Sequence, residues 1–170
     1  MRGIILNVAA LGLLAACSDD APPAKPAKVR ADALKPGEYE VTATVDVLRS
    51  TDKTTPATKS KAGATQTARI CVPADVALDP ATFAEAGEKC TGSDNYMSGG
   101  RMSLQYKCLR AGEQVTQTVD GSFTADSFTG KVMTATYFQG SGDYEMTRTM
   151  TAKRVGECSA AAVPAENKAS

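Results

Sequence analysis

The sequence predicts a mainly all-β domain, an antiparallel meander of about seven strands that forms a curved sheet or half-barrel, with one short helix and two disulfides. Apolar and polar residues alternate with a period of two from Tyr39 to Val47, which is typical of a strand with one buried face. Glycine-rich and Asp/Ser-rich turn signals recur between apolar stretches from Asp94 onward. Four cysteines follow residue 70, and this even number fits paired disulfides in an exported domain.

The first 35 residues are predicted to lie outside this domain. A basic residue and an apolar run lead into Leu14-Ala15-Ala16-Cys17, which resembles the cleavage site of a bacterial lipoprotein signal peptide. Residues 1–16 would then be removed, and Cys17 would carry the lipid that attaches the chain to a membrane. Residues 17–35, rich in Pro, Ala and Lys, would form a flexible tether, and residues 159–170 a disordered C-terminal tail.

The residue after the lipidated cysteine indicates to which membrane the protein is sorted. Ser18 follows Cys17, as in lipoproteins of the Gram-negative outer membrane, which this segment resembles, and Asp19 comes one place later. We therefore expect a lipid-anchored protein of a Gram-negative cell envelope, on the outer membrane and facing the periplasm, that acts as a non-enzymatic binding or structural module. Its expected partners are the membrane, through the lipid on Cys17, and an envelope protein or a glycan.

Composition excludes several function classes. The chain has no histidine, which removes Ser-His-Asp and Cys-His nucleophiles and every His-containing metal site. Loss of the signal peptide takes one basic residue, Arg2, and leaves 18 basic and 19 acidic side chains, a net charge of −1. This balance argues against a nucleic-acid partner, because such binding needs concentrated positive charge. Cys-x-x-Cys pairs are absent, and we predict neither a metal site nor a cofactor.

The remaining cysteines are predicted to form two disulfides. With Cys17 committed to a lipid, an even set of four is left, and sequence alone allows three connectivities. A bridge from Cys90 to Cys108 would span a predicted two-residue hairpin turn. Cys71 would then pair with Cys158 and join an early strand to the last one.

The β domain is predicted to span residues 36–158. Its first strand covers residues 39–47, with Tyr39 and the valines on the inward face. Residues 50–61 lack an apolar period and are expected to form a mobile loop, and a second strand covers residues 65–72.

One short helix and a series of hairpins follow. Asp79 suits the N-cap of a helix over residues 79–87, and Phe83 suits its buried anchor. From residue 94 the chain alternates strands and turns. The predicted turns are Gly99-Gly100, Ala111-Gly112, Ala125-Asp126-Ser127 and Gly140-Ser141-Gly142-Asp143.

The last turn provides a candidate binding surface, because aromatic side chains beside glycines and a carboxylate suit contacts with a protein or a glycan. Its candidate residues are Tyr137, Phe138, Ser141, Asp143 and Tyr144. Ser141-Gly142-Asp143-Tyr144 is similar to the Ser-Gly-x-x-Tyr loop of membrane-bound lysozyme inhibitors but is one residue short. That similarity implies an inhibitor of lysozyme as one alternative function.

Two other functions are compatible with the sequence. A curved meander can enclose a pocket, which would suit a carrier of a small lipophilic ligand. A hydrolase would have to use carboxylates in place of histidine, and no catalytic residue is assigned. Its candidate carboxylates are Glu38, Glu40, Asp120 and Asp143.

Two motifs at the ends of the domain resemble a known family. Lys35-Pro36-Gly37-Glu38-Tyr39-Glu40 is similar to its opening Pro-Gly-x-Trp/Tyr-Glu strand, and Arg154-Val155-Gly156-Glu157-Cys158 to its Arg-x-Gly-x-Cys ending. The family comprises small proteobacterial envelope proteins known only as a domain of unknown function. Tyr39 stands where tryptophan is common, and the resemblance covers residues 34–158. It implies an envelope domain with spaced cysteines and no known activity.

Overall fold

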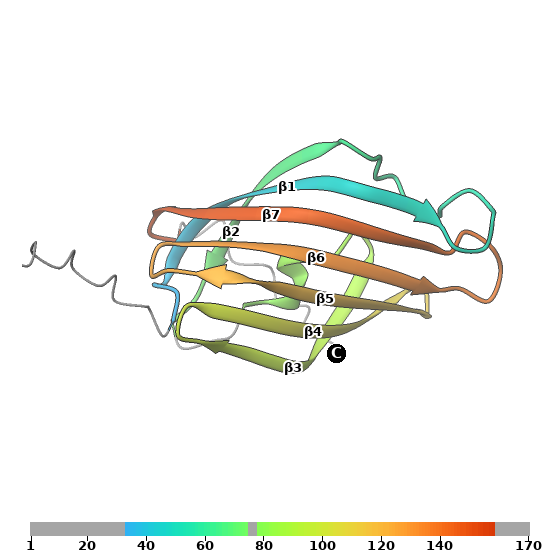
Figure 1. Cartoon of the computed structure of the whole chain (residues 1–170). Helices are drawn as coiled ribbons and strands as arrows, with labels where there is room; N and C mark the ends of the chain where they lie inside the picture. Colours follow the sequence, from blue (N-terminus) through green and yellow to red (C-terminus); the bar gives the residue numbers. More distant parts are fainter. Residues whose placement is uncertain (1–32, 75–77, 159–170) are drawn as a thin grey trace, which may run out of the picture.

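The computed structural model describes residues 33–74 and 78–158, which form one curved, all-β sheet (Figure 1). The predicted signal peptide, lipidated Cys17, tether and tail lie outside the described residues, apart from the last residues of the tether. Within the described ranges, no helix is long and apolar enough to cross a membrane. The elements are β1 (Gly37–Ser50), β2 (Thr65–Val72), the 3-10 turn η1 (Pro80–Thr82), β3 (Glu88–Ser98), β4 (Arg101–Arg110), β5 (Glu113–Phe123), β6 (Ser127–Tyr137) and β7 (Tyr144–Gly156).

The strands are all antiparallel to their neighbours, in the order β2-β1-β7-β6-β5-β4-β3. Strands β3 to β7 form a continuous meander, and the hairpin of β1 and β2 joins it beside β7. The sheet curls around its inner face, with β1 and β7 side by side and β3 at the far edge (Figure 1). The predicted fold class, a seven-stranded antiparallel half-barrel, is confirmed.

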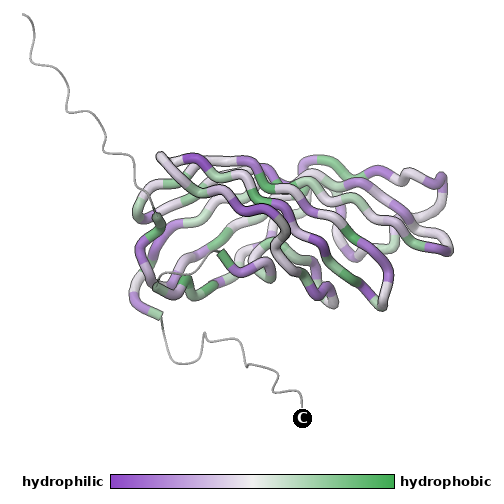
Figure 2. Tube along the Cα trace, turned by 90° about the horizontal axis from the view of Figure 1, so that it is seen from below, coloured by the Kyte–Doolittle hydropathy of each residue, from purple (hydrophilic) through white to green (hydrophobic). Residues whose placement is uncertain are grey.

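Alternating side chains build the core on the inner face. In β4, Met102, Leu104 and Tyr106 are buried while the residues between them are exposed. Figure 2 shows the same alternation of hydropathy along the strands. Burial of one face therefore stabilises the inner strands, whereas the edge strand β2 is mostly exposed.

The predicted helix over residues 79–87 is wrong in length, because only the 3-10 turn η1 forms. Asp79 does act as the predicted cap, accepting a hydrogen bond from the amide of Ala81 at 2.8 Å. The turn ends at Thr82, and beyond it the amide of Glu85 donates to the side chain of Glu88 at 2.9 Å. The predicted anchor is confirmed: Phe83 is fully buried and stacks on Tyr106, with ring centroids 5.6 Å apart.

A β-bulge changes the end of the first strand. The pairing of β1 with β7 shifts between Val45 and Val47, so one residue is left over on β1. Val45 is buried, but Val47, predicted to face inward, is 49% exposed. A one-residue shift moves every later side chain to the opposite face, which explains the difference.

One end of the half-barrel, which we call the tied end, joins the start of the domain to its finish. The Arg154 side chain donates through Nε to the carbonyl of Pro36 at 2.8 Å. A Cβ atom on Gly37 would lie 2.5 Å from that Nε and 2.5 Å from the carbonyl oxygen of Gly156. The two motifs at the ends of the domain therefore meet in space, and glycine is required where they touch.

Both predicted disulfides are present. Cys71 at the end of β2 pairs with Cys158 at the tied end, across 87 residues of sequence. Cys90 and Cys108 pair across the neighbouring strands β3 and β4. The Cys71–Cys158 bridge covalently fixes the edge strand β2 to the segment that follows β7.

Candidate functional site

The opposite end, which we call the pocket end, contains a pocket of about 720 Å³. It lies between the β1–β2 loop, residues 51–64, and the inner face of the sheet. This volume falls within the roughly 300–1,000 Å³ typical of small-molecule sites. Its apolar lining includes Ala43, Val45, Pro56, Ala57, Ala64, Ala84 and Ala86, and its charged lining consists of Lys59, Lys61, Glu85, Arg110 and Arg148.

Side chains from the core hold the β1–β2 loop over the pocket. The Oε1 atom of Glu85 accepts hydrogen bonds from the hydroxyls of Thr58, at 2.6 Å, and Ser60, at 2.8 Å. Arg110 donates through Nη1 to the carbonyl of Ala57 at 2.9 Å. The segment expected to form a mobile loop, residues 50–61, is therefore held by polar contacts, which a search for an apolar pattern does not reveal.

The same loop is also fastened to the turn between β6 and β7. The Oδ2 atom of Asp52 accepts hydrogen bonds from the amides of Gly142, at 2.7 Å, and Asp143, at 3.0 Å. Hydrogen bonds from the side chain and the amide of Thr54, with those two amides, hold the pKa of Asp52 well below its ordinary value. The carboxylate thus acts as a charged bridge between two loops that are far apart in sequence.

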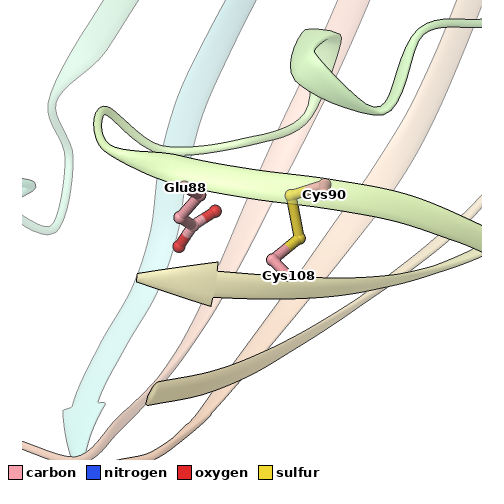
Figure 3. A group of neighbouring side chains, drawn as sticks. All are labelled: Glu88, Cys90 and Cys108. Atoms are coloured by element: carbon pink, nitrogen blue, oxygen red, sulfur yellow. A yellow bond between two sulfur atoms is a disulfide. The ribbon is translucent and has the colours of Figure 1, made fainter. Parts of the chain in front are cut away.

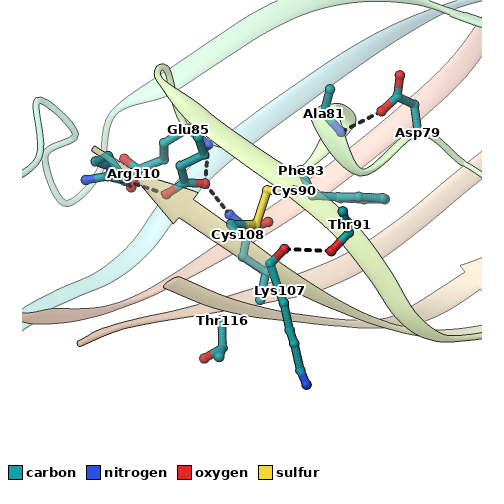
Figure 4. The surroundings of a disulfide bond; sticks show 12 residues. Asp79, Ala81, Phe83, Glu85, Cys90, Thr91, Lys107, Cys108, Arg110 and Thr116 are labelled. Atoms are coloured by element: carbon teal, nitrogen blue, oxygen red, sulfur yellow. Dashed lines mark hydrogen bonds and ion pairs between the residues drawn. A yellow bond between two sulfur atoms is a disulfide. The ribbon is translucent and has the colours of Figure 1, made fainter. Parts of the chain in front are cut away.

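A buried ion-pair cluster forms the base of the pocket end. Arg110 Nη2 lies 2.7 Å from Glu85 Oε2 and also contacts Glu88, whose side chain is fully buried. The Tyr144 hydroxyl donates to Glu85, and Gln117 donates through Nε2 to Glu88 at 2.7 Å. Figure 4 shows Arg110 and Glu85 together beside the Cys90–Cys108 disulfide.

Hydrogen bonding determines the titration of Glu85. Burial raises the pKa of this carboxyl. Hydrogen bonds from Thr58, Tyr144, Ser60 and Arg110 together lower it by a larger amount, so the pKa of Glu85 is below its ordinary value. Burial and the neighbouring Glu85 charge raise the pKa of Tyr144 well above its ordinary value, which keeps that phenol protonated as a donor. The cluster is therefore a carboxylate held ionised by a cation and three hydroxyls.

Arg148 extends from β7 into the interior and is only 8% exposed. It lines the pocket and donates through Nη2 to the carbonyl of Phe83, while its Nε has no hydrogen-bond partner within the described residues. Burial lowers its pKa, and the more distant charges of Glu85 and Glu88 oppose that effect. Among the described residues, no carboxylate lies within ion-pair distance of Arg148.

Glu88, Cys90 and Cys108 form one group that could be mistaken for a metal centre. Their ligand atoms lie within 4.8 Å of one another (Figure 3). Both sulfur atoms are joined in the disulfide, so neither is available as a thiolate, and Glu88 is already paired with Arg110. This group is therefore structural.

The structure separates the five predicted binding residues of the last turn. Tyr144 is fully buried, and Phe138 is partly buried beside it. Asp143 stabilises the turn by accepting from the Thr136 hydroxyl at 2.9 Å and the Phe138 amide at 2.8 Å. Tyr137, which is 59% exposed, and Ser141 remain on the surface.

The segment similar to a lysozyme-inhibitor loop is packed into the protein. Gly142 is buried, and its amide donates to Asp52 and, at 2.7 Å, to the hydroxyl of Thr54. The tyrosine at its end, Tyr144, points into the core. This packing does not favour insertion of the segment into another protein.

The four carboxylates considered for hydrolysis lie in three separate places: Glu38 and Glu40 on β1, Asp120 on β5 and Asp143 in the β6–β7 turn. Glu38 pairs with Arg69 across β1 and β2 at 3.2 Å, and Asp120 accepts from the Ser103 hydroxyl at 2.9 Å. Glu40 is exposed on β1. The carboxylates that do lie together are Glu85 and Glu88, which the sequence analysis did not select.

A sequence signal for this cluster did exist. Arg148 falls between Met146 and Met150 in the inward register of β7, and Gln117 falls between Val115 and Val119 in β5. A polar residue at an inward position must find a partner inside the sheet. Glu85 and Glu88 gave no such signal, because they lie in and just after an irregular segment with no period.

Comparison with known proteins gives one match. The model of a family described as "Protein of unknown function (DUF3617)" matches residues 34–158. No curated protein and no solved structure matches the chain.

Proposed function

The chain belongs to the DUF3617 family, whose function is unknown, and from this premise we propose that it is a lipid-anchored binding protein of the bacterial cell envelope that holds a small ligand in its pocket. The observation that carries this proposal is the pocket of about 720 Å³ beneath the β1–β2 loop. A half-barrel with one open end and a fastened loop provides a concave, largely pre-formed site.

The chemistry of the pocket supports binding rather than catalysis. Glu85 accepts four hydrogen bonds, from Thr58, Ser60, Arg110 and Tyr144. A general base needs a free lone pair directed at its substrate, and a nucleophile needs a neighbouring base. A carboxylate saturated in this way orders its surroundings instead of exchanging protons with a ligand.

The proposed location is supported by the sequence and the disulfides together. Leu14-Ala15-Ala16-Cys17 provides a lipidation signal, and the remaining four cysteines pair completely. Disulfides persist in oxidising compartments such as the bacterial periplasm. Anchoring to the outer membrane, on the periplasmic side, is the address most consistent with Ser18 after the lipidated cysteine.

Mass spectrometry of the native protein tests the binding role. Protein extracted gently from its membrane is expected to carry a small molecule, and Ala64→Trp, which fills the pocket, is expected to lose it. Ala62→Trp is the matched control, because Ala62 is exposed in the same loop and does not line the pocket. Absence of any bound molecule in the wild type, or equal retention in both variants, would contradict the proposal.

Detergent-phase partition tests the anchor. The wild type is expected to enter the detergent phase, and Cys17→Ser the aqueous phase, because a lipid chain adds roughly 0.8 kcal/mol of membrane affinity per buried methylene. Density-gradient separation of the inner and outer membranes then tests the proposed location on the outer membrane. Wild-type protein that stays in the aqueous phase would rule out lipidation.

A further inference from the structure

We propose that the ligand of this pocket is an alkyl carboxylate, with its head among Arg148, Lys59 and Lys61 and its chain on the alanine-lined wall. This inference rests on the proposed binding function and specifies the ligand class. It uses three features of the same pocket: a buried cation, a basic rim and an apolar wall.

The buried cation is Arg148. Its side chain lines the pocket, and the residue is only 8% exposed. Among the described residues, no carboxylate lies within ion-pair distance of it. Its Nε also lacks a partner there. A buried charge is costly unless it is paired, so an anion that enters the pocket gains from this guanidinium.

The other charges of the lining do not supply that anion. Glu85 is the acidic residue of the lining, and it is already bound by Arg110 and the hydroxyls of the loop and of Tyr144. The second carboxylate of the cluster, Glu88, pairs with the same Arg110. Both carboxylates of the cluster are therefore already paired with Arg110, and neither compensates Arg148 by a direct contact.

The rim adds further positive charge. Lys59 and Lys61 line the pocket from the β1–β2 loop, and neither has an ion-pair partner within the described part of the chain. Two exposed ammonium groups at the mouth attract an anion and raise its association rate. A cationic ligand would meet repulsion at the same place.

The wall selects an alkyl chain. Ala43, Val45, Ala64 and Ala84 present methyl groups along the pocket. Burying apolar surface against them contributes about 25 cal/mol per Å². A carboxylate head suits the basic groups, because guanidinium and carboxylate form charge-assisted hydrogen bonds in matching planar geometry.

Calorimetric titration with probes of one chain length tests the proposal. The protein is the full mature chain, residues 17–170, with Cys17→Ser to avoid detergent. Decanoate is expected to bind about tenfold or more tightly than decanol or decyltrimethylammonium, and acetate not measurably. Raising the ionic strength should weaken the binding of decanoate and leave that of the neutral decanol unchanged. Decyl phosphate is an additional arm: tighter binding of the phosphate than of the carboxylate would overturn the choice of head group.

Substitution of the rim locates the charge effect. Lys59→Gln with Lys61→Gln is expected to weaken decanoate binding about tenfold and to leave decanol unchanged. Lys89→Gln with Lys107→Gln is the matched control, because both lysines are exposed on β3 and β4 away from the pocket and the net charge changes equally. Equal weakening by both pairs would indicate general charge rather than the rim.

The role of the buried cation is tested by Arg148→Lys and Arg148→Met. Lysine keeps the charge and is expected to retain part of the preference for decanoate over decanol, while methionine should remove most of it. Urea unfolding shows whether each Arg148 variant folds. If neither folds, the binding measurements on the Lys59→Gln/Lys61→Gln variant decide the proposal. Equal binding of decanoate and decanol by the wild type would overturn the proposal of an anionic ligand but leave the proposed binding function standing. Absence of any bound molecule in the native wild-type protein would contradict both proposals.

Discussion

At the tied end of the half-barrel the chain is held by the Cys71–Cys158 disulfide, by close backbone contacts and by Arg154, whereas at the pocket end the β1–β2 loop is held by hydrogen bonds to charged side chains. Cys71–Cys158 and the contact of Gly37 with Gly156 need no ionisation state to persist. The β1–β2 loop depends instead on the carboxylates of Glu85 and Asp52. The two ends therefore differ in what conditions can loosen them.

This difference separates stability from function in the molecule. Covalent and steric constraints at one end maintain the sheet, so the opposite end can include a pocket and an incompletely paired arginine without unfolding the domain. Ligand-binding regions are commonly drawn from the less stable parts of a structure. We expect the pocket end to open before the tied end does.

Removal of the two disulfides provides the largest test of this comparison. In the loop-entropy model, loss of Cys71–Cys158, which closes an 87-residue separation, costs about 4–5 kcal/mol, and loss of Cys90–Cys108, with a separation of 18, about 3 kcal/mol. Paired Cys→Ser substitutions at each bridge, measured by urea unfolding, test the order. A larger loss from the Cys90–Cys108 pair would show that the tied end is not the main constraint.

Neutralising one carboxylate of the cluster is the next largest change. Glu85→Gln should cost about 2–3 kcal/mol, because it leaves the partly buried Arg110 with one fewer anion. It should also speed amide hydrogen exchange at Thr58 and Ser60, which Glu85 holds. Glu88→Gln is the matched variant, since Glu88 contacts Arg110 but not the loop. Similar exchange of the loop in both variants would contradict the role of Glu85 as its fastening.

The two ends also differ in how far the sequence predicts them. Strand alternation, turn glycines and cysteine parity predicted the half-barrel, both disulfides and the Phe83 anchor, because each depends on local pattern or simple counting. The end motifs marked residues that meet at the tied end. The pocket cluster depends on contacts between segments far apart in sequence, such as Glu85 with Tyr144 and Asp52 with Gly142, which no local period reveals.

Lowering the pH should loosen the pocket end selectively. The pKa of Glu85 is lowered in the folded protein, so its contribution to stability is fully present above its unfolded value, near 4.5, and is lost as the pH falls through the lower folded pKa. The loss of stability from protonating Glu85 should not exceed the loss caused by Glu85→Gln. The protection factors for hydrogen exchange at residues 57–60, corrected for the intrinsic rate at each pH, should therefore fall below pH 4.5 before those of β7 do. In Glu85→Gln the acid-induced change at this loop should be much smaller, and an unchanged response would assign the effect to another carboxylate.

The smallest expected effect concerns the contact between the β1–β2 loop and the β6–β7 turn. Gly142 has φ of +103°, and a Cβ atom there would lie 2.7 Å from the Cβ of Ala57. Gly142→Ala should therefore cost about 1–2 kcal/mol through backbone strain and this clash. Ala57→Gly removes the clash but not the strain, so the double variant should recover part of the loss in urea unfolding. Recovery would show that the loop presses directly on the turn. If Gly142→Ala costs the same with and without Ala57→Gly, backbone conformation alone requires the glycine, and the loop is fastened there only by Asp52 and its neighbouring hydrogen bonds.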